Sequence, residues 1–480
     1  IERAVGERIA GRVEVSGMSL SWAGPQAAGS VEVFTPDGDR VADVSVTVER
    51  PLLGLLFADG ARRDLGEVAI GGRVSAERGE DGAWSLARAL ESASDPAPDG
   101  PVLGPDETAD AHEPLTLPNG VEATLRLVAI DVAVSPGGRN ASGDAARPIE
   151  GTLDGTLVYA PGRPVRAELS LVRAGAVGDP VTLLALTAEL ADLVAEDGSL
   201  TTADASGPIR LELRAPTELV ARVLDERAGG AGETGGGVEG LAAVRVAGGR
   251  IELDAEGGGV GLRGMLPAAV ATRLASGEGA GRGGAAATFT DDVGFELVTN
   301  ALSVPLPPRG DPGAWDLRDA TFVAQLETTA ASARVRADEG VGTVRVDPLR
   351  GGVSLIEGAG GFIVSAETSA SYEGEPAGSV LLDVRATGWL DNDGTLRSGP
   401  EFVRARAMAS GTPAALLAPV LERAGLRPSE VLGETVSVDV RAGMRTAAGD
   451  GEAFITVGDR RVELPEVGVP YVAASLASRL

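Results

Sequence analysis

The chain has 480 residues, a formal net charge of −28 and no cysteine, which excludes disulfides, thiol nucleophiles and thiolate metal sites. The acidic balance argues against nucleic acid as a partner, because phosphates require cationic neutralisation, and against electrostatic docking on anionic lipid. Only 3% of the residues are aromatic, although small-molecule pockets usually recruit aromatic side chains. No apolar run reaches the roughly 20 residues that a helix needs to span a bilayer.

The first predicted strand changes its apolar parity at Gly17. Val13 and Val15 alternate before this glycine. After it, the apolar residues stand on the opposite parity, at Met18, Leu20 and Trp22. A glycine at such a phase shift predicts a bulge or a tight turn. We expect the turn to aim these residues at an apolar patch that caps the first edge of the sheet, formed by Leu52, Leu53, Leu55, Leu56 and Phe57. Packing in that cap predicts that Trp22→Ala costs roughly 3–5 kcal/mol.

Strand signals then continue along most of the chain. At 41–50, aliphatic residues alternate with polar ones, which is typical of a half-buried strand. The same style recurs at 121–134, 151–160, 163–174, 249–257, 320–337, 378–390 and 434–444. Asp-Gly pairs predict hairpin turns at 37–38, 81–82, 154–155 and 393–394. These patterns predict a mainly β protein built as a long, curved antiparallel meander.

Four short helices are predicted, each with a proline near its first turn. They lie at 216–227, 265–276, 412–425 and 468–480. Because the two pairs recur in order, they suggest an internal duplication of about 200 residues. We therefore divide the chain into an N-terminal β region, an acidic disordered linker and two β-groove repeats with short helices, at 1–90, 91–116, 117–285 and 286–480.

Residues that could perform chemistry are scarce. The single histidine, His112, falls in the predicted linker, so histidine triads and histidine zinc sites are excluded. The glycines at 279–284 match a dinucleotide-binding spacing, but no strand precedes them, and a flexible loop is the better interpretation. The stretch 391–395 begins like a calcium loop and lacks the later ligands. We therefore predict a protein that is not an enzyme and uses no metal or cofactor.

The first 90 residues carry a series of short motifs in a fixed order. They are "IAGRVEVSGMSLSWAG", "PLLGLLFADG" and "DLGEVAIGGRVSAERGEDGAWSLARAL". This order resembles the beginning of the AsmA-like family of bacterial envelope proteins. The resemblance implies a twisted, taco-like antiparallel sheet with an apolar groove. It also implies a periplasmic protein that carries phospholipid or another envelope lipid between the inner and outer membranes, or assists outer-membrane assembly proteins.

The resemblance further implies an inner-membrane anchor, which we expect to precede Ile1 because the chain begins in mid-pattern. An acyl chain of sixteen carbons costs on the order of 12 kcal/mol to expose to water, and a continuous groove removes most of that cost. We expect one concave face to be shared by Val44, Val46, Val48, Leu125, Leu127, Leu169 and Leu171. The alternative is that these aliphatics form the closed core of a cell-surface or adhesion-type β protein.

Overall fold

The computed structural model describes the chain in segments separated by gaps. They are residues 10–56, 63–77, 84–90, 121–135, 149–174, 180–216, 237–276, 287–307, 316–337, 340–356, 361–390, 394, 401–413, 435–445, 453–457, 460–464 and 471–478. Several predicted features lie outside these segments. They are the linker 91–116 with His112, the turn at 81–82, the glycines at 279–284, most of 391–395, and nearly all of the predicted helices at 216–227 and 412–425.

Strands dominate the described residues, which confirms the prediction of a mainly β protein. In chain order they are β1 (Arg12–Ser19), β2 (Gln26–Phe34), β3 (Arg40–Val48), β4 (Arg63–Glu77), β5 (Val121–Ser135), β6 (Ile149–Tyr159), β7 (Val165–Ala174), β8 (Pro180–Leu190), β9 (Gly207–Pro216), β10 (Gly237–Ala247), β11 (Arg250–Leu253), β12 (Val260–Leu266), β13 (Ala287–Phe289), β14 (Val293–Pro305), β15 (Thr321–Thr328), β16 (Ala331–Ala337), β17 (Gly340–Val346), β18 (Arg350–Ile356), β19 (Gly361–Tyr372), β20 (Glu375–Thr387), β21 (Phe402–Pro413), β22 (Thr435–Arg445), β23 (Ala453–Val457), β24 (Arg460–Leu464) and β25 (Tyr471–Ser478). The helices of the described segments are α2 (Leu52–Leu56), α3 (Ser85–Leu90) and α5 (Ala268–Ser276).

Twenty-three of these strands form one sheet, and β23 and β24 make a separate hairpin. Neighbours in the chain are mostly neighbours in the sheet and pair antiparallel, as β2 does with β3 and β6 with β7. Among the described pairs the exception is β4 with β5, which run parallel. A parallel pair requires a crossover of a dozen residues or more. The chain from Glu77 to Val121, which includes α3, provides one.

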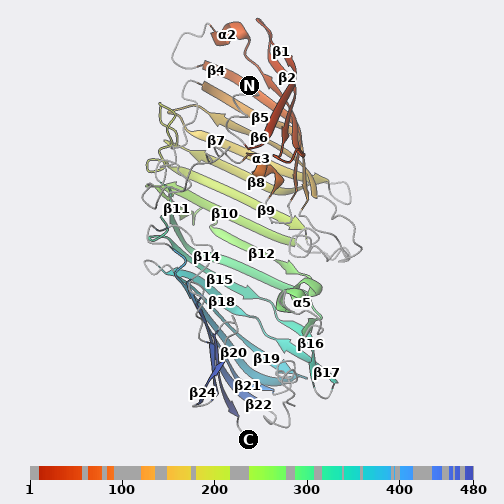
Figure 1. The fold of residues 1–480 in the computed structure, drawn as a ribbon, viewed down its shortest axis with the longest axis vertical. Helices are drawn as coiled ribbons and strands as arrows, with labels where there is room; N and C mark the ends of the chain where they lie inside the picture. Colours follow the sequence, from red (N-terminus) through yellow and green to blue (C-terminus); the bar gives the residue numbers. More distant parts are fainter. Residues whose placement is uncertain are drawn as a thin grey trace, which may run out of the picture.

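In the middle of the molecule the strands, such as β8 to β15, lie across the long axis and are stacked along it, and toward both ends they turn closer to that axis, with α2 at one end and β22 and β24 at the other (Figure 1). Four positions in the stack are each filled by two strands in line, because one long strand is interrupted there. For example, β11 and β12 both pair with β10 and β14. Twenty-three strands with four shared positions make nineteen positions. At about 4.8 Å per strand the sheet is roughly 90 Å long.

Two local predictions were wrong. The segment 468–480 was predicted as a helix, but its described part forms β25, with Ala474 opposite Val440 of β22. The alternation of apolar residues in "YVAASLAS" fits a strand, and pairing with β22 overrides helix propensity. The proposed duplication thus loses its fourth helix. The other error is the turn at 154–155, which lies inside β6. By contrast, Asp37 and Gly38 do connect β2 with β3, and Gly38 has φ 96°.

A line of backbone irregularities, which we call the crease, crosses the first strands of the sheet. Ala28 and Val31 of β2 are three residues apart but face Val46 and Val44 of β3, which are two apart. This offset is a one-residue bulge, and it places both β2 residues on the same face. Gly17 of β1 has φ 63° at the same level. The predicted phase shift at Gly17 is therefore confirmed, and it keeps the apolar residues on one face instead of dividing them between two.

The crease continues into β4 and β5. Gly72 has φ 143°, and a Cβ there would lie 2.3 Å from the carbonyl oxygen of Asp43. Ala129 has φ 46°, which is uncommon for a residue with a side chain. The Ala129 N–H donates a 2.8 Å hydrogen bond to Asp154 of β6. Asp154, which the sequence predicted to be a turn residue, thus holds the bulge of the neighbouring strand β5.

Enclosed side chains are few among the described residues. The largest ones less than 2% exposed are Val194, Val270 and Pro161, so no described leucine, phenylalanine or tryptophan is fully enclosed. Helix α3 covers one small area, where Ala89 is buried and accepts a hydrogen bond from the Gly11 N–H. In the described segments the sheet is therefore covered locally, by short helices and, beside β25, by the β23–β24 hairpin.

Candidate functional site: an apolar face

One face of the sheet carries an apolar row that runs from strand to strand, which we call the central row. Residues opposite one another in neighbouring strands lie on the same face. Following the register gives one residue on each of seventeen positions, namely Met18, Ala28, Val46, Ile70, Leu127, Gly155, Leu169, Leu186, Leu211, Ala242, Val260, Thr299, Ala324, Val353, Val364, Val384 and Ala405. Thr299 is the only polar residue among them.

Shorter rows flank the central row on both sides. One comprises Val48, Val68, Leu125, Leu157, Ala167, Ala188, Ile209 and Val244. The other comprises Ile130, Leu153, Leu171, Leu184, Leu213, Gly240, Leu262, Leu297, Leu326, Gly351, Ala366, Leu382 and Ala407. The three rows together define the apolar face.

The apolar face is neither enclosed nor fully exposed. Most of its members are half-buried. A few are more open, including Leu213 and Leu382 at 37% exposure each. Soluble monomers rarely expose contiguous apolar patches beyond a few hundred Å². A continuous aliphatic surface of this length is therefore a candidate binding surface.

The register places six of the seven predicted groove residues in these rows, and the seventh, Val44, lies on the same face two residues before Val46 in β3. Val46, Leu127 and Leu169 belong to the central row, and the others lie beside it. All seven are half-buried. Their role in lipid binding stays a prediction.

A hollow of about 1130 Å³ opens at the ends of β9, β10, β12, β14 and β15, and its lining includes the charged residues Arg214, Glu239, Arg263, Glu296 and Glu327. Val238, Met265 and Phe295 supply its apolar lining. Gly264 stands between Val238 and Phe295 in the register, and a Cβ there would lie 2.7 Å from the Gly237 carbonyl oxygen. The sheet is therefore closely packed at this point, and the hollow lies at the strand ends, between charged residues and a few apolar ones, so it does not extend the apolar face.

The opposite face carries charge, and cross-strand ion pairs neutralise much of it. Arg263 donates to Glu239 of the neighbouring strand at 2.7 Å, and Arg166 pairs with Glu189 in the same way. The hydrogen bond and the charge of Arg263 lower the pKa of Glu239. These groups are exposed, so the pairs favour the register more than they add to stability.

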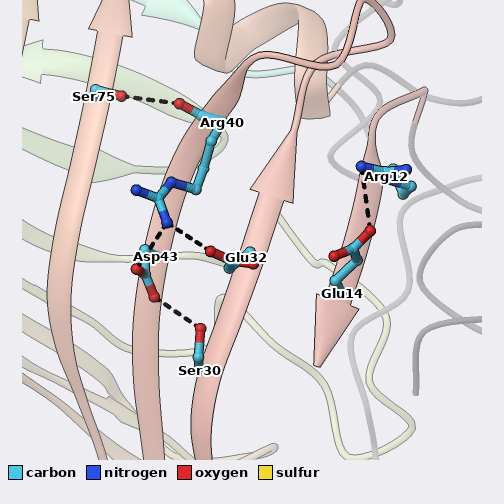
Figure 2. A network of polar contacts seen from close by, with 7 residues as sticks. All are labelled: Arg12, Glu14, Ser30, Glu32, Arg40, Asp43 and Ser75. Carbon is cyan, nitrogen blue, oxygen red and sulfur yellow. Dashed lines mark hydrogen bonds and ion pairs between the residues drawn. The ribbon is translucent and has the colours of Figure 1, made fainter. Parts of the chain in front are cut away.

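On β1 to β4 the charged face holds a polar network (Figure 2). Glu32 faces Asp43 directly across the strands, which is unfavourable for like charges. Arg40 relieves this, because it donates to Glu32 at 2.6 Å and to Asp43 at 3.2 Å, and these carboxylates raise the pKa of Arg40. Ser30 donates a further hydrogen bond to Asp43 at 2.9 Å.

Where the crease crosses the charged face there is a polar hollow of about 580 Å³. Arg73 in its lining lies 3.6 Å from Asp131, and Arg40 is held by the network just described. The cations of this hollow are therefore matched by carboxylates within the sheet, and it offers no charge for a ligand to neutralise.

The predicted edge cap forms only in part. Helix α2 is attached to the segment after β1, because the Leu52 and Leu53 N–H groups donate to the Ser21 and Trp22 carbonyl oxygens at 3.1 and 3.3 Å. Trp22, however, is 61% exposed, so the expectation that it is packed in the cap was wrong. The backbone contact brings α2 to the strand, but the indole lies outside it. The side chains of Leu56 and Phe57 lie outside the described residues.

Sequence reasoning missed how far the apolar face extends beyond Leu171. The alternation in β9 to β21 was visible, but the register that aligns one strand with the next depends on the turns and connections as well as on the strand pattern. Within the described segments no group of three or more His, Asp or Glu side chains has the spacing of a metal site. No described helix is long and apolar enough to cross a membrane. No family model, curated protein or solved structure matches the chain.

Proposed function

We propose that the apolar face binds lipid acyl chains, in a non-enzymatic envelope protein that carries lipid between the inner and outer membranes or assists outer-membrane assembly. The observation that supports this most strongly is the central row. It crosses seventeen neighbouring positions with one polar residue, and most of its side chains are half-buried. A closed core of the adhesion-type alternative would instead bury these side chains against a second layer.

The chemistry of the face suits sliding rather than tight binding. Each methylene kept from water saves about 0.8 kcal/mol, so an acyl chain gains wherever it lies along the row. Val, Leu and Ala present no charge and no buried hydrogen-bonding group that a moving chain would have to leave. The proposed periplasmic location and inner-membrane attachment rest on the resemblance of residues 1–90 to the AsmA-like family.

The test is lipid recovery from the protein purified from bacterial cells, measured by mass spectrometry of an organic extract. We expect phospholipid with the unmodified chain and little with Val46→Asp, because a carboxylate in the central row blocks an acyl chain. The control is Thr47→Asp, which places the same charge one residue later, on the charged face. It should leave lipid recovery unchanged.

A second pair of variants tests the middle of the sheet. Leu186→Asp enters the central row on β8, and Thr187→Asp is its exposed counterpart on the other face. Val46→Asp and Leu186→Asp should each cost little stability, because the side chains that they replace are half-buried. If both row variants unfold the protein, the face is enclosed and the closed-core alternative holds. Unchanged lipid recovery in folded row variants would equally reject the proposal.

A further inference from the structure

The end of the sheet at β1 carries an exposed apolar cluster that begins with Met18 of the central row and extends beyond it. We call it the apolar tip, and it consists of Met18, Leu20, Trp22 and Leu53. Their exposures are 52%, 62%, 61% and 45%. Three of these residues stand within a five-residue stretch, and α2 brings the fourth beside them through its hydrogen bonds to Ser21 and Trp22. Helix α2, which carries Leu53, lies at one end of the long axis (Figure 1).

The tip is also free of charge over an unusual length. Residues 15–31 contain no Asp, Glu, Lys or Arg, and neither do residues 51–56, although 23% of the chain is charged. The nearest cation after β3, Arg50, is paired with Asp64 at 2.5 Å. That hydrogen bond raises the pKa of Arg50 and lowers the pKa of Asp64. The tip thus contains no charged side chain in residues 15–31 and 51–56, and the charge of the neighbouring Arg50 is neutralised by Asp64.

These features point to hydrocarbon rather than to a protein surface. A stable protein interface buries about 800 Å² on each partner and involves some 20–30 residues a side. Four side chains on a turn and a five-residue helix are fewer than such an interface needs. They suit insertion into a bilayer, where every charged residue is costly and tryptophan favours the headgroup boundary.

The tip is continuous with the apolar face. Met18 is opposite Ala28, and Ala28 is opposite Val46 of the central row. An acyl chain that leaves a bilayer at Trp22 therefore reaches the row without crossing a charged residue. The crease makes this possible, because the bulges at Gly17 and in β2 hold Met18 and Ala28 on the apolar face.

We propose that the apolar tip inserts into a membrane surface of uncharged or zwitterionic headgroups and there joins the bilayer to the central row. That the tip joins the bilayer to the central row rests on the proposed function. That the tip inserts into a membrane surface does not depend on it. Because the chain has a net charge of −28, anionic lipid should weaken the insertion, and added salt should not abolish it.

The test uses the full chain and vesicles of phosphatidylcholine, with binding measured by flotation and insertion by quenching of tryptophan fluorescence with brominated lipid. Trp22→Ser and Leu20→Ser should each weaken binding about tenfold or more, since each removes a large apolar side chain from the bilayer. The control is Val341→Ser, which removes an equally exposed apolar side chain, 68% exposed, from β17. It should bind as the unmodified chain does.

Three results would overturn the inference: no binding to phosphatidylcholine, equal loss with the Val341 control, or binding that requires anionic lipid. Unfolding is a separate matter, and an unchanged melting temperature of the serine variants excludes it. Lipid recovery from Val46→Asp distinguishes the two proposals. If Val46→Asp loses its lipid but the unmodified chain does not bind vesicles, the tip is rejected and the lipid-carrying face is kept. If the unmodified chain binds vesicles but Val46→Asp keeps all its lipid, the lipid-carrying face is rejected and the tip is kept as a membrane contact.

Discussion

Strands β1 to β5 and strands β8 to β12 continue the same apolar face by different means. In the first region the register shifts within the pairs β2–β3 and β4–β5, and Gly17, Gly72 and Ala129 adopt positive φ. In the second region the pairs β8–β9, β9–β10 and β10–β12 keep one register throughout. Simple alternation is enough there, whereas the first region needs a bulge each time the apolar parity changes. A continuous face can thus be built from an irregular sequence, provided that glycine or a held residue stands at each irregularity.

The largest expected effect concerns a glycine in each region. Gly72→Ala should destabilise the protein by more than about 3 kcal/mol, because a Cβ would lie 2.3 Å from the Asp43 carbonyl oxygen at a φ that side chains rarely adopt. Gly240→Ala should change the free energy of unfolding by less than about 1 kcal/mol, since its closest new contact is 3.2 Å from a flexible Leu262 methyl group. Urea titration measures both. Equal costs would show that the crease imposes no special geometry.

The next effect separates exposed from buried apolar residues. Val246→Ala in β10 should cost about 2 kcal/mol, because that valine is 3% exposed. Trp22→Ala in the first region should cost less than about 1 kcal/mol despite its larger side chain, because most of the indole is in water. Urea midpoints of the two variants make the comparison. A cost of 3 kcal/mol or more for Trp22→Ala, on the order expected from the sequence, would mean that the indole is packed.

A smaller effect should have opposite signs in the two regions. Ala129→Gly should stabilise the protein by about 0.5–1 kcal/mol, because Ala129 has φ 46° and glycine adopts that conformation without a steric penalty. Ala185→Gly in β8 should destabilise it by a similar amount, because an ordinary strand residue gains only chain entropy in the unfolded state. Differential thermal melts can resolve the sign. Destabilisation by Ala129→Gly would show that its conformation carries no strain.

The smallest effect is electrostatic. Arg263 lowers the pKa of Glu239, so the carboxylate contributes stability above its unfolded pKa of about 4.5 and loses it as the pH falls through the lower folded value. Glu239→Gln should therefore lower the urea midpoint slightly at pH 7, and the difference should vanish near pH 3. High salt should also reduce it. A difference that grows on acidification would contradict the assignment.

The sequence predicted what alternation determines and missed what depends on partners. The strand that contains Val44, Val46 and Val48 could be placed because its apolar residues have a period of two. The strand at 471–478 was mistaken for a helix because its alanines and leucine favour a helix, and only pairing with β22 makes the segment a strand. Asp154 resembled a turn residue because Gly155 follows it, and its hydrogen bond to Ala129 could not be foreseen because the two residues are 25 apart in sequence. The parallel pairing of β4 with β5 likewise depends on where a long connection returns.

The same physical limit applies to the candidate site. Its residue types were visible, since seven aliphatic positions on one face could be selected from their parity alone. The exposure of Trp22 was not, because a tryptophan beside a leucine-rich segment has the composition of a core. Whether such a residue is covered depends on which other parts of the chain pack over it, and no local sequence pattern encodes that packing.

Because the strands in the middle of the sheet cross the long axis in nearly the order of the chain, the interstrand hydrogen bonds there point along that axis. A force applied between the two ends would therefore act on neighbouring strand pairs in series, and the strands would separate one after another as their interstrand hydrogen bonds break. Each eleven-residue strand such as β6 would release about 30 Å of chain beyond the ~4.8 Å it occupied. Stretched between two anchored surfaces, the molecule would behave as a compliant tether that lengthens in steps at low force, rather than as a stiff strut.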